Sequence, residues 1–241
     1  MKEWYKEAGE RVMLHMDSRE DGLTTAQVKE RLDEYGNNEL VEGKKKSLLE
    51  VFLSQFCDLL VIILIIAAVI SAISGNVEST IVIIAVLILN AILGTVQYSK
   101  AQKSLDSLKS LSAPCAKVRR NGVKMAVASK DIVPGDILEL EAGDLVVADG
   151  RILHNYSLQV NESSLTGEST NVDKEDGVIT EEAALADRKN MVYSGSLVTY
   201  GRATVVVTET GMQTEMGKIA RLMNDTKEKK TPLQVSLDQF S

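Results

Sequence analysis

Two long apolar segments interrupt a chain that is otherwise rich in charged residues. The first has a charge-free core from Leu59 to Ile73, and the second runs from Ile81 to about Tyr98. Both are rich in Ile, Leu and Val, and only residues 74–80 separate them. Buried core helices of a soluble protein would give a similar pattern. Two such segments in close succession favour a transmembrane helical hairpin, and hence contact with a lipid bilayer.

The lengths of these segments set the expected spans. The charge-free core of the first has about 15 residues, whereas a straight crossing takes about 20. Extending it back to Val51 supplies the missing length and includes Asp58. We therefore expect spans at about residues 51–73 and 80–98. Asp58 would then lie near one end of the first span, where an acid reaches water, although ionisable groups at membrane depth are often functional.

The charges that flank the hairpin indicate its orientation. Lysines lie outside it at both ends, whereas Glu78 is the charged residue of the connecting turn; these lysines are Lys44, Lys45, Lys46, Lys100, Lys103 and Lys109. Positive charge is retained on the cytoplasmic side of a membrane. We therefore expect an integral protein of the cell membrane, with its N-terminus and everything after the hairpin in the cytoplasm.

After the hairpin the apolar pattern changes to the period of two that is typical of strands. The β-type runs cover residues 116–127, 137–140, 145–147 and 203–208, and glycines punctuate them. Short strands at this spacing, without helices between them, predict a small all-β sandwich or distorted jelly roll. The polar stretch from Asp173 to Lys189 is interpreted as an exposed excursion.

Helices are expected on both sides of this β domain. Thr24 and Gln27 fit a capping box, and apolar residues at helical spacing follow up to Gly36. Residues 212–224 predict a closing helix with an apolar face formed by Met216, Ile219, Ala220 and Met223. The fold class is thus mixed, a membrane hairpin plus a β domain with helices packed on it. The expected parts are residues 1–46, 47–111, 112–226 and a linker at 227–241.

Composition excludes several classes of function. The 241 residues carry a formal net charge of -7 and have no basic stripe, which argues against nucleic-acid binding. The two cysteines, Cys57 and Cys115, lie far apart and in no metal-ligand spacing. We therefore expect no disulfide framework, no metal site and no bound cofactor within these residues.

Candidate chemistry is concentrated in the stretch Val160–Ser169, which reads VNESSLTGES. Gly167 allows a turn that few other residues tolerate. Glu168 is then carried on a short polar loop, where its carboxylate could accept a proton or orient a water. A surface turn with an incidental acid is the alternative interpretation.

This string resembles the actuator-domain signature of P-type cation-transporting ATPases, most closely the calcium-pump-like branch. The resemblance continues in order on both sides of the loop and covers nearly the whole chain. Its further blocks lie at residues 22–40, 131–152, 190–203, 210–219 and 231–234. Ser196 stands where the family usually has Thr, a conservative change.

The resemblance implies a role for each residue of the loop. P-type pumps form an aspartyl-phosphate from ATP and hydrolyse it with the help of the actuator domain, which also moves the attached membrane helices. By resemblance, Glu168 orients or deprotonates the attacking water. Gly167 lets the backbone approach the phosphate, and Thr166 and Ser169 donate hydrogen bonds or hold the loop.

The resemblance also implies partners that these residues do not supply. No Asp-Lys-Thr-Gly phosphorylation motif occurs, and Gly211–Ile219 fails the P-loop spacing, so we interpret it as a turn leading into a helix. We expect the N-terminal part of a pump that alone neither binds ATP productively nor transports. ATP, Mg²⁺, the phosphorylation and nucleotide-binding domains and a transported cation, with calcium favoured, belong to the full-length protein.

Two other hypotheses remain open. The chain could be a non-enzymatic, membrane-anchored β domain that regulates or assembles with a pump. It could also be a membrane-tethered β domain in which the loop sequence is incidental. Phosphorylation and nucleotide-binding segments encoded downstream would favour the N-terminal part of a pump over both of these hypotheses.

Overall fold

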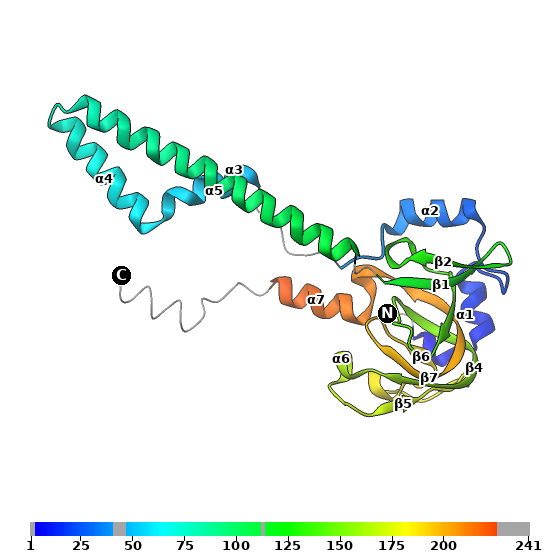
Figure 1. Ribbon diagram of the computed structural model, residues 1–241. Coiled ribbons are helices and arrows are strands. Elements are labelled where there is room, and N and C mark those ends of the chain that lie inside the picture. The colour runs from blue at the N-terminus through cyan, green and yellow to red at the C-terminus, as the bar shows by residue number, and fades with distance from the viewer. Residues whose placement is uncertain (1–2, 41–46, 112–113, 226–241) are drawn as a thin grey trace. The chain divides into compact units, whose positions relative to one another are not determined.

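The computed structural model describes residues 3–40, 47–111 and 114–225, and the chain divides into two compact units (Figure 1). One unit contains residues 1–42 and 114–241, and the other contains residues 43–113. Lys44, Lys45 and Lys46, the side chain of Lys109 and the expected linker at 227–241 lie outside what is described.

The first unit is built on a seven-stranded sheet in which all pairs are antiparallel. The strand order is β2-β1-β3-β7-β4-β5, and β6 pairs with β4. The strands are β1 (Cys115–Arg120), β2 (Val123–Ala128), β3 (Ile137–Glu141), β4 (Asp149–Asn161), β5 (Asn171–Asp173), β6 (Met191–Val192) and β7 (Leu197–Glu209). The mixed fold class, with an all-β domain flanked by helices, is confirmed.

The long strands β4 and β7 pair along their length and form the middle of the sheet. Their register shifts where Gly201 meets Ser157, and both residues have positive φ, 75° and 53°. A Cβ at Gly201 would lie 2.2 Å from the Ser157 carbonyl oxygen, so this bulge requires glycine. The expected strand at 203–208 is therefore too short, because Gly201 bends the strand without ending it.

The core of this unit lies on both faces of the β4–β7 pair. One cluster contains Val118, Leu138, Val146, Ile152, Val160 and Val205, which are all buried. A second cluster joins the sheet to the N-terminal segment through Trp4, Tyr5, Val12, Ile137, Tyr193 and Val206. Alternate residues of β7 thus face different clusters, as the period of a strand requires.

The N-terminal segment forms η1 (Trp4–Lys6), α1 (Gly9–His15) and α2 (Thr25–Tyr35). The predicted capping box is present at α2, where the Gln27 N–H donates to Thr24 Oγ1 and the Thr24 N–H donates to Gln27 Oε1. Val28 is buried against Leu23 and Val133. The helix is thus packed on the β domain, as expected.

The closing helix differs from its prediction. Residues 211–213 form the turn η5, and α7 (Glu215–Asp225) begins after it, so the interpretation of Gly211–Ile219 as a turn leading into a helix is correct. However, Met223 is 70% exposed, and within the described residues α7 contacts the domain mainly through its first turn. The expected apolar face is not packed along its whole length.

One further expectation was wrong, and a second holds for most of its residues. Residues 145–147 form no regular strand, because only Leu145 makes an isolated bridge, to Leu197. The stretch after Asp173 is mostly exposed but is anchored to the core. Lys174 is buried, and the buried Arg151 guanidinium donates to the carbonyls of residues 176 and 177 at 3.0 and 2.8 Å.

The second unit consists of α3 (Leu48–Ser54), η2 (Gln55–Cys57), α4 (Leu59–Ile73) and α5 (Val77–Leu111). Among the described helices, α5 alone is long and apolar enough to cross a bilayer. The segment before it bends by 70° and would be a second span only if both halves act together. The bend occurs because Asp58 is extended and caps α4, accepting the Leu60 N–H at 3.3 Å, so the first span is not one straight helix.

Candidate functional site

The loop singled out by the sequence closes the hairpin between β4 and β5. Asn161 pairs with Asn171 at the end of the ladder, and residues 162–170 form the connection. The connection begins with a single helical turn, α6 (Ser163–Thr166). Thr166, Gly167, Glu168 and Ser169 therefore lie together at the tip of a hairpin that belongs to the central sheet.

The turn is centred on the Glu162 carbonyl and ends at a glycine. The Glu162 carbonyl accepts the N–H groups of Leu165 and Thr166, both at 2.9 Å, and the Thr166 hydroxyl at 3.1 Å. Gly167 follows in the left-handed conformation, with φ 78° and ψ −2°. No heavy atom lies within 4 Å of the position that a methyl group would occupy there, so glycine is required by conformation and not by crowding.

Glu168 follows this turn with its side chain exposed. Its N–H donates to Thr166 Oγ1 at 3.3 Å, which holds the backbone of the acid. Within the described residues, its carboxylate forms no hydrogen bond or ion pair of its own. The carboxylate is therefore free to act on a group that arrives from outside the domain.

Two side chains that the sequence pattern did not single out hold the flanks of the loop. Asn161 accepts the Ser163 N–H at 3.1 Å and donates from Nδ2 to the Ser169 carbonyl at 3.2 Å. The Ser164 hydroxyl donates to the Gly195 carbonyl at 3.1 Å, which connects the loop to the turn after β6. The loop is thus fastened to the end of β4 and to the turn after β6, while the roles assigned to Thr166 and Ser169 stay predictions.

A fully buried ion pair lies at the base of the loop. Lys174 Nζ is 2.5 Å from Glu162 Oε1, and both side chains have no exposed surface. Burial raises the pKa of the Glu162 carboxyl and lowers the pKa of the Lys174 ammonium, and each partner opposes the shift of the other. Lys174 was missed because its stretch of sequence has the polar composition of an exposed segment.

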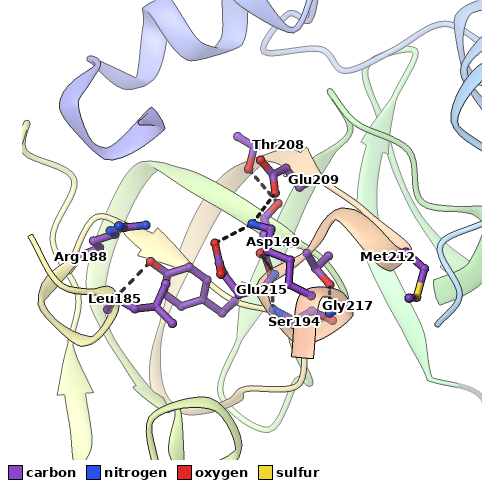
Figure 2. Close-up of polar contacts among 12 residues, drawn as sticks. Asp149, Leu185, Arg188, Ser194, Thr208, Glu209, Met212, Glu215 and Gly217 are labelled. Carbon is purple, nitrogen blue, oxygen red and sulfur yellow. Dashed lines mark hydrogen bonds and ion pairs between the residues drawn. The ribbon is translucent and has the colours of Figure 1, made fainter. Parts of the chain in front are cut away.

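A second group of titratable side chains lies at the opposite end of β4, at the N-terminal end of α7 (Figure 2). The Asp149 carboxylate accepts the N–H of Ser194 at 2.8 Å and that of Glu215 at 2.7 Å. Burial raises the pKa of Asp149 to about 7, against the effect of these two donors. Nearby, Lys218 bridges Glu209 and Glu215. In the sequence, Asp149 was noted only as one member of the block at residues 131–152 that carries the family resemblance.

The loop can present the Glu168 carboxylate to an external group, but the described residues around it supply few ligands for a metal ion. Across residues 3–40, 47–111 and 114–225, no group of three or more His, Cys, Asp or Glu side chains could hold a metal ion. The chemistry of the loop therefore depends on what it meets, since a lone carboxylate on a fixed turn can orient or deprotonate a water.

Two family models match the chain. Residues 110–224 match the P-type ATPase actuator domain, and residues 4–71 match the N-terminus of cation transporters and ATPases. The first match includes the whole β4–β5 hairpin, and the second includes the capped helix α2 and the start of the apolar hairpin.

Similar proteins with curated names agree with these matches. A calcium-transporting ATPase of Listeria monocytogenes is 46% identical over 239 residues, which is 99% of this chain and 27% of the relative. One from Lactococcus lactis is 44% identical, over 98% of this chain and 27% of the relative. A probable cation-transporting ATPase F of Mycobacterium bovis is 40% identical over 97% of this chain. The chain spans about a quarter of the length of these relatives.

Proposed function

The chain belongs to the P-type ATPase family, whose N-terminal cation-transporter segment and actuator domain it contains, and we propose that its loop promotes hydrolysis of an aspartyl-phosphate intermediate. Glu168 orients the attacking water or takes its proton. One observation carries this proposal. The Glu168 carboxylate is exposed and, among the described residues, unpartnered, while the backbone on which it stands is fixed by Thr166 and Gly167.

The other loop residues assist this step. The Thr166 hydroxyl links the Glu162 carbonyl to the Glu168 N–H and so acts as a strut within the turn. Gly167 leaves the tip without a side chain, which allows a phosphorylated surface to approach the backbone closely. Ser169 follows the acid in the chain, its carbonyl accepts Asn161 Nδ2, and its hydroxyl donates to the same incoming group. Negative charge on the phosphoryl oxygens in the transition state of hydrolysis is stabilised by hydrogen-bond donors such as these hydroxyl groups.

The remaining parts of the reaction come from other domains. We propose ATP and Mg²⁺ as the energy source and cofactor of the complete pump, and its phosphorylation and nucleotide-binding domains as the partners of this loop. The names of the Listeria and Lactococcus relatives support calcium as the transported cation. The chain's own described residues offer no cluster of ligands for it.

The hairpin places this domain at a membrane. Apolar side chains cover the outside of α4 and α5, including Leu60, Ile73 and Leu89, which are 71%, 82% and 66% exposed. Such a surface suits lipid and is unfavourable in water. Lys100 and Lys103 lie on α5 beyond its apolar part, whereas Glu78 lies at its start. These charges support a cytoplasmic β domain and N-terminus, and movement of the domain would pull on the helices.

A chimeric pump tests the proposal. This chain replaces the matching N-terminal residues of the Listeria relative, and phosphorylation from ATP and decay of the phosphoenzyme are followed separately. Glu168→Gln should form phosphoenzyme at the normal level and hydrolyse it about 10² to 10⁴ times more slowly, the usual loss for one positioned acid or base.

The control for this experiment is Glu181→Gln, which removes another exposed carboxylate of the same domain outside the loop. It should leave both steps unchanged. Unaltered phosphoenzyme decay in Glu168→Gln would contradict the role proposed for this residue.

A further inference from the structure

The buried ion pair Glu162–Lys174 connects the first residue of the loop to the residue that follows β5. Glu162 follows the last residue of β4, and Lys174 follows the last residue of β5. Their charged atoms are 2.5 Å apart and both side chains are fully buried. Within the described residues, the two groups have no other hydrogen-bonding partner, although the Tyr193 ring lies 5.7 Å from Lys174 Nζ.

Stability alone does not account for such a pair. Taking two charges out of water costs more than their attraction commonly returns, and well-packed apolar residues at such a site are often as stable or more so. A buried pair can instead fix one arrangement among several, because a charge-assisted contact is directional and an apolar contact is not. The question is which arrangement this pair selects.

The two residues differ in what their backbones hold. The Glu162 carbonyl receives three donors from the loop, two from Thr166 and one from Leu165. The backbone of Lys174 is fixed to the sheet, since its N–H donates to the Leu158 carbonyl at 2.9 Å and its carbonyl accepts Asn155 Nδ2. The side-chain contact therefore ties the hub of the loop to a rigid part of the sheet.

We propose that Glu162 and Lys174 act as a positioning pair that sets the orientation of the turn at residues 163–169, and through it the Glu168 carboxylate, for phosphoenzyme hydrolysis. This inference rests on the proposed function of Glu168. Neither residue touches the reacting group. The ion pair keeps the Glu162 peptide from rotating. The Glu162 carbonyl then holds the Thr166 hydroxyl in the position where that hydroxyl accepts the Glu168 N–H.

The first test compares stability with loop order in the 241-residue chain, reconstituted in lipid nanodiscs. Lys174→Met leaves Glu162 buried without a partner and should lower the urea midpoint of the domain. Glu162→Leu/Lys174→Met removes both charges and should restore the midpoint. Amide hydrogen exchange of residues 163–169 should nevertheless be at least about tenfold faster in the double variant, while exchange of β7 is unchanged.

The second test places the same variants in the chimeric pump. The double variant should form phosphoenzyme normally and hydrolyse it about 10²-fold more slowly, the scale of loss that a misplacement of about 1 Å produces. Glu162→Gln, which keeps the size of the side chain and an acceptor for Lys174, provides a milder second variant. It should fold and should hydrolyse phosphoenzyme more slowly than the unmodified chimera. Lys117→Met/Glu141→Gln, which removes an exposed ion pair of the same domain, should change neither readout.

The outcomes separate the two proposals. Slow hydrolysis in Glu168→Gln together with normal hydrolysis in both the double variant and Glu162→Gln overturns the positioning role and leaves the function of Glu168 standing. Normal hydrolysis in Glu168→Gln overturns the proposed function itself. Loop exchange equal to that of the unmodified chain in a stable double variant also overturns the positioning role, whatever the pump does.

Discussion

The carboxylate of Asp149 accepts the backbone N–H of Glu215 at 2.7 Å, so the first residue of β4 caps the first turn of α7. The same carboxylate accepts the Ser194 N–H, and the Asp149 carbonyl accepts the Thr208 hydroxyl at 3.2 Å. One buried acid thus connects three segments that are distant in sequence. Its ionisation has consequences for stability.

The stability of the domain should fall as pH rises from about 4 to about 7. Burial raises the pKa of Asp149 to about 7 in the fold, from an ordinary 3.8. In this window the folded state holds a proton that the unfolded chain releases, so higher pH favours unfolding. The contribution is at most about 4 kcal/mol and is constant above the window.

Asp149→Asn should make this slope smaller, and Asp33→Asn, which changes an exposed acid on α2, should leave it as it is. Trp4 is the single tryptophan and is buried against the sheet, so its fluorescence reports urea unfolding of this unit. A variant Asp149→Asn with the same dependence on pH as the unmodified chain would contradict this assignment.

Gly167→Ala should slow phosphoenzyme hydrolysis with a small loss of stability. The left-handed conformation of Gly167 costs another residue about 1 kcal/mol, and no neighbour lies within 4 Å to clash with a methyl group. Gly143→Ala is the matched control, because Gly143 also has positive φ and open space but lies outside the loop. The two variants should unfold alike, and only the first should impair hydrolysis in the chimera.

Asp136→Asn should destabilise the β domain by about 3 to 5 kcal/mol, the usual cost of breaking a buried pair. Asp136 is fully buried and accepts Arg120 at 2.8 and 2.6 Å and the Val133 N–H at 2.9 Å. Glu141→Gln, which breaks an exposed pair with Lys117, should leave the urea midpoint unchanged. Equal midpoints for both variants would refute the importance of burial here.

Thr24→Ala should cost about 1 kcal/mol through loss of the capping box at α2. The substitution removes the hydroxyl that accepts the Gln27 N–H, whereas the Thr24 N–H that donates to Gln27 Oε1 belongs to the backbone and is kept. Thr24→Ser keeps a hydroxyl and should recover most of the loss. The measurement is the urea midpoint followed by Trp4, and no recovery in the serine variant would argue against capping.

Cysteine labelling in intact cells should distinguish the two faces of the membrane. Cys115 is exposed on the β domain, and Asn76 lies in the turn between α4 and α5. In a Cys57→Ser background, a membrane-impermeant maleimide should label Asn76→Cys and leave Cys115 unlabelled until the cells are opened. Labelling of Cys115 in intact cells would reverse the proposed orientation.

Local signals in the sequence were sufficient for some of these features. The capping box depends on residues three apart, and the αL turn at Gly167 depends on one residue, so both could be predicted. The bend at Asp58 could not be predicted, because an acid within an apolar segment is compatible both with the end of a membrane span and with a break between two helices. Gly201 was interpreted as punctuation between strands because only its partner Ser157, on another strand, identifies a bulge.

The buried pair beneath the loop shows a similar limit. Leu158 and Val160 alternate at the end of β4, and Glu162 continues their spacing just beyond its last residue, so a period of two places Glu162 on the inward face. That pattern alone predicts a buried acid and therefore a partner. The identity of Lys174 as that partner follows from the hairpin that returns through β5, and a polar stretch gave no indication that its first lysine is inside.

β4 carries the Asp149 cap at one end and the loop with Glu168 at the other. Its 13 residues cover roughly 40 Å at about 3.3 Å each, and β7 braces most of that length. The strand therefore connects the residue that caps α7 to the loop that carries Glu168. Coupling between two sites acts equally in both directions. If docking of the Glu168 loop changes the equilibrium of the α7 contact at Asp149, then a change in that contact must alter the affinity of docking by the same factor.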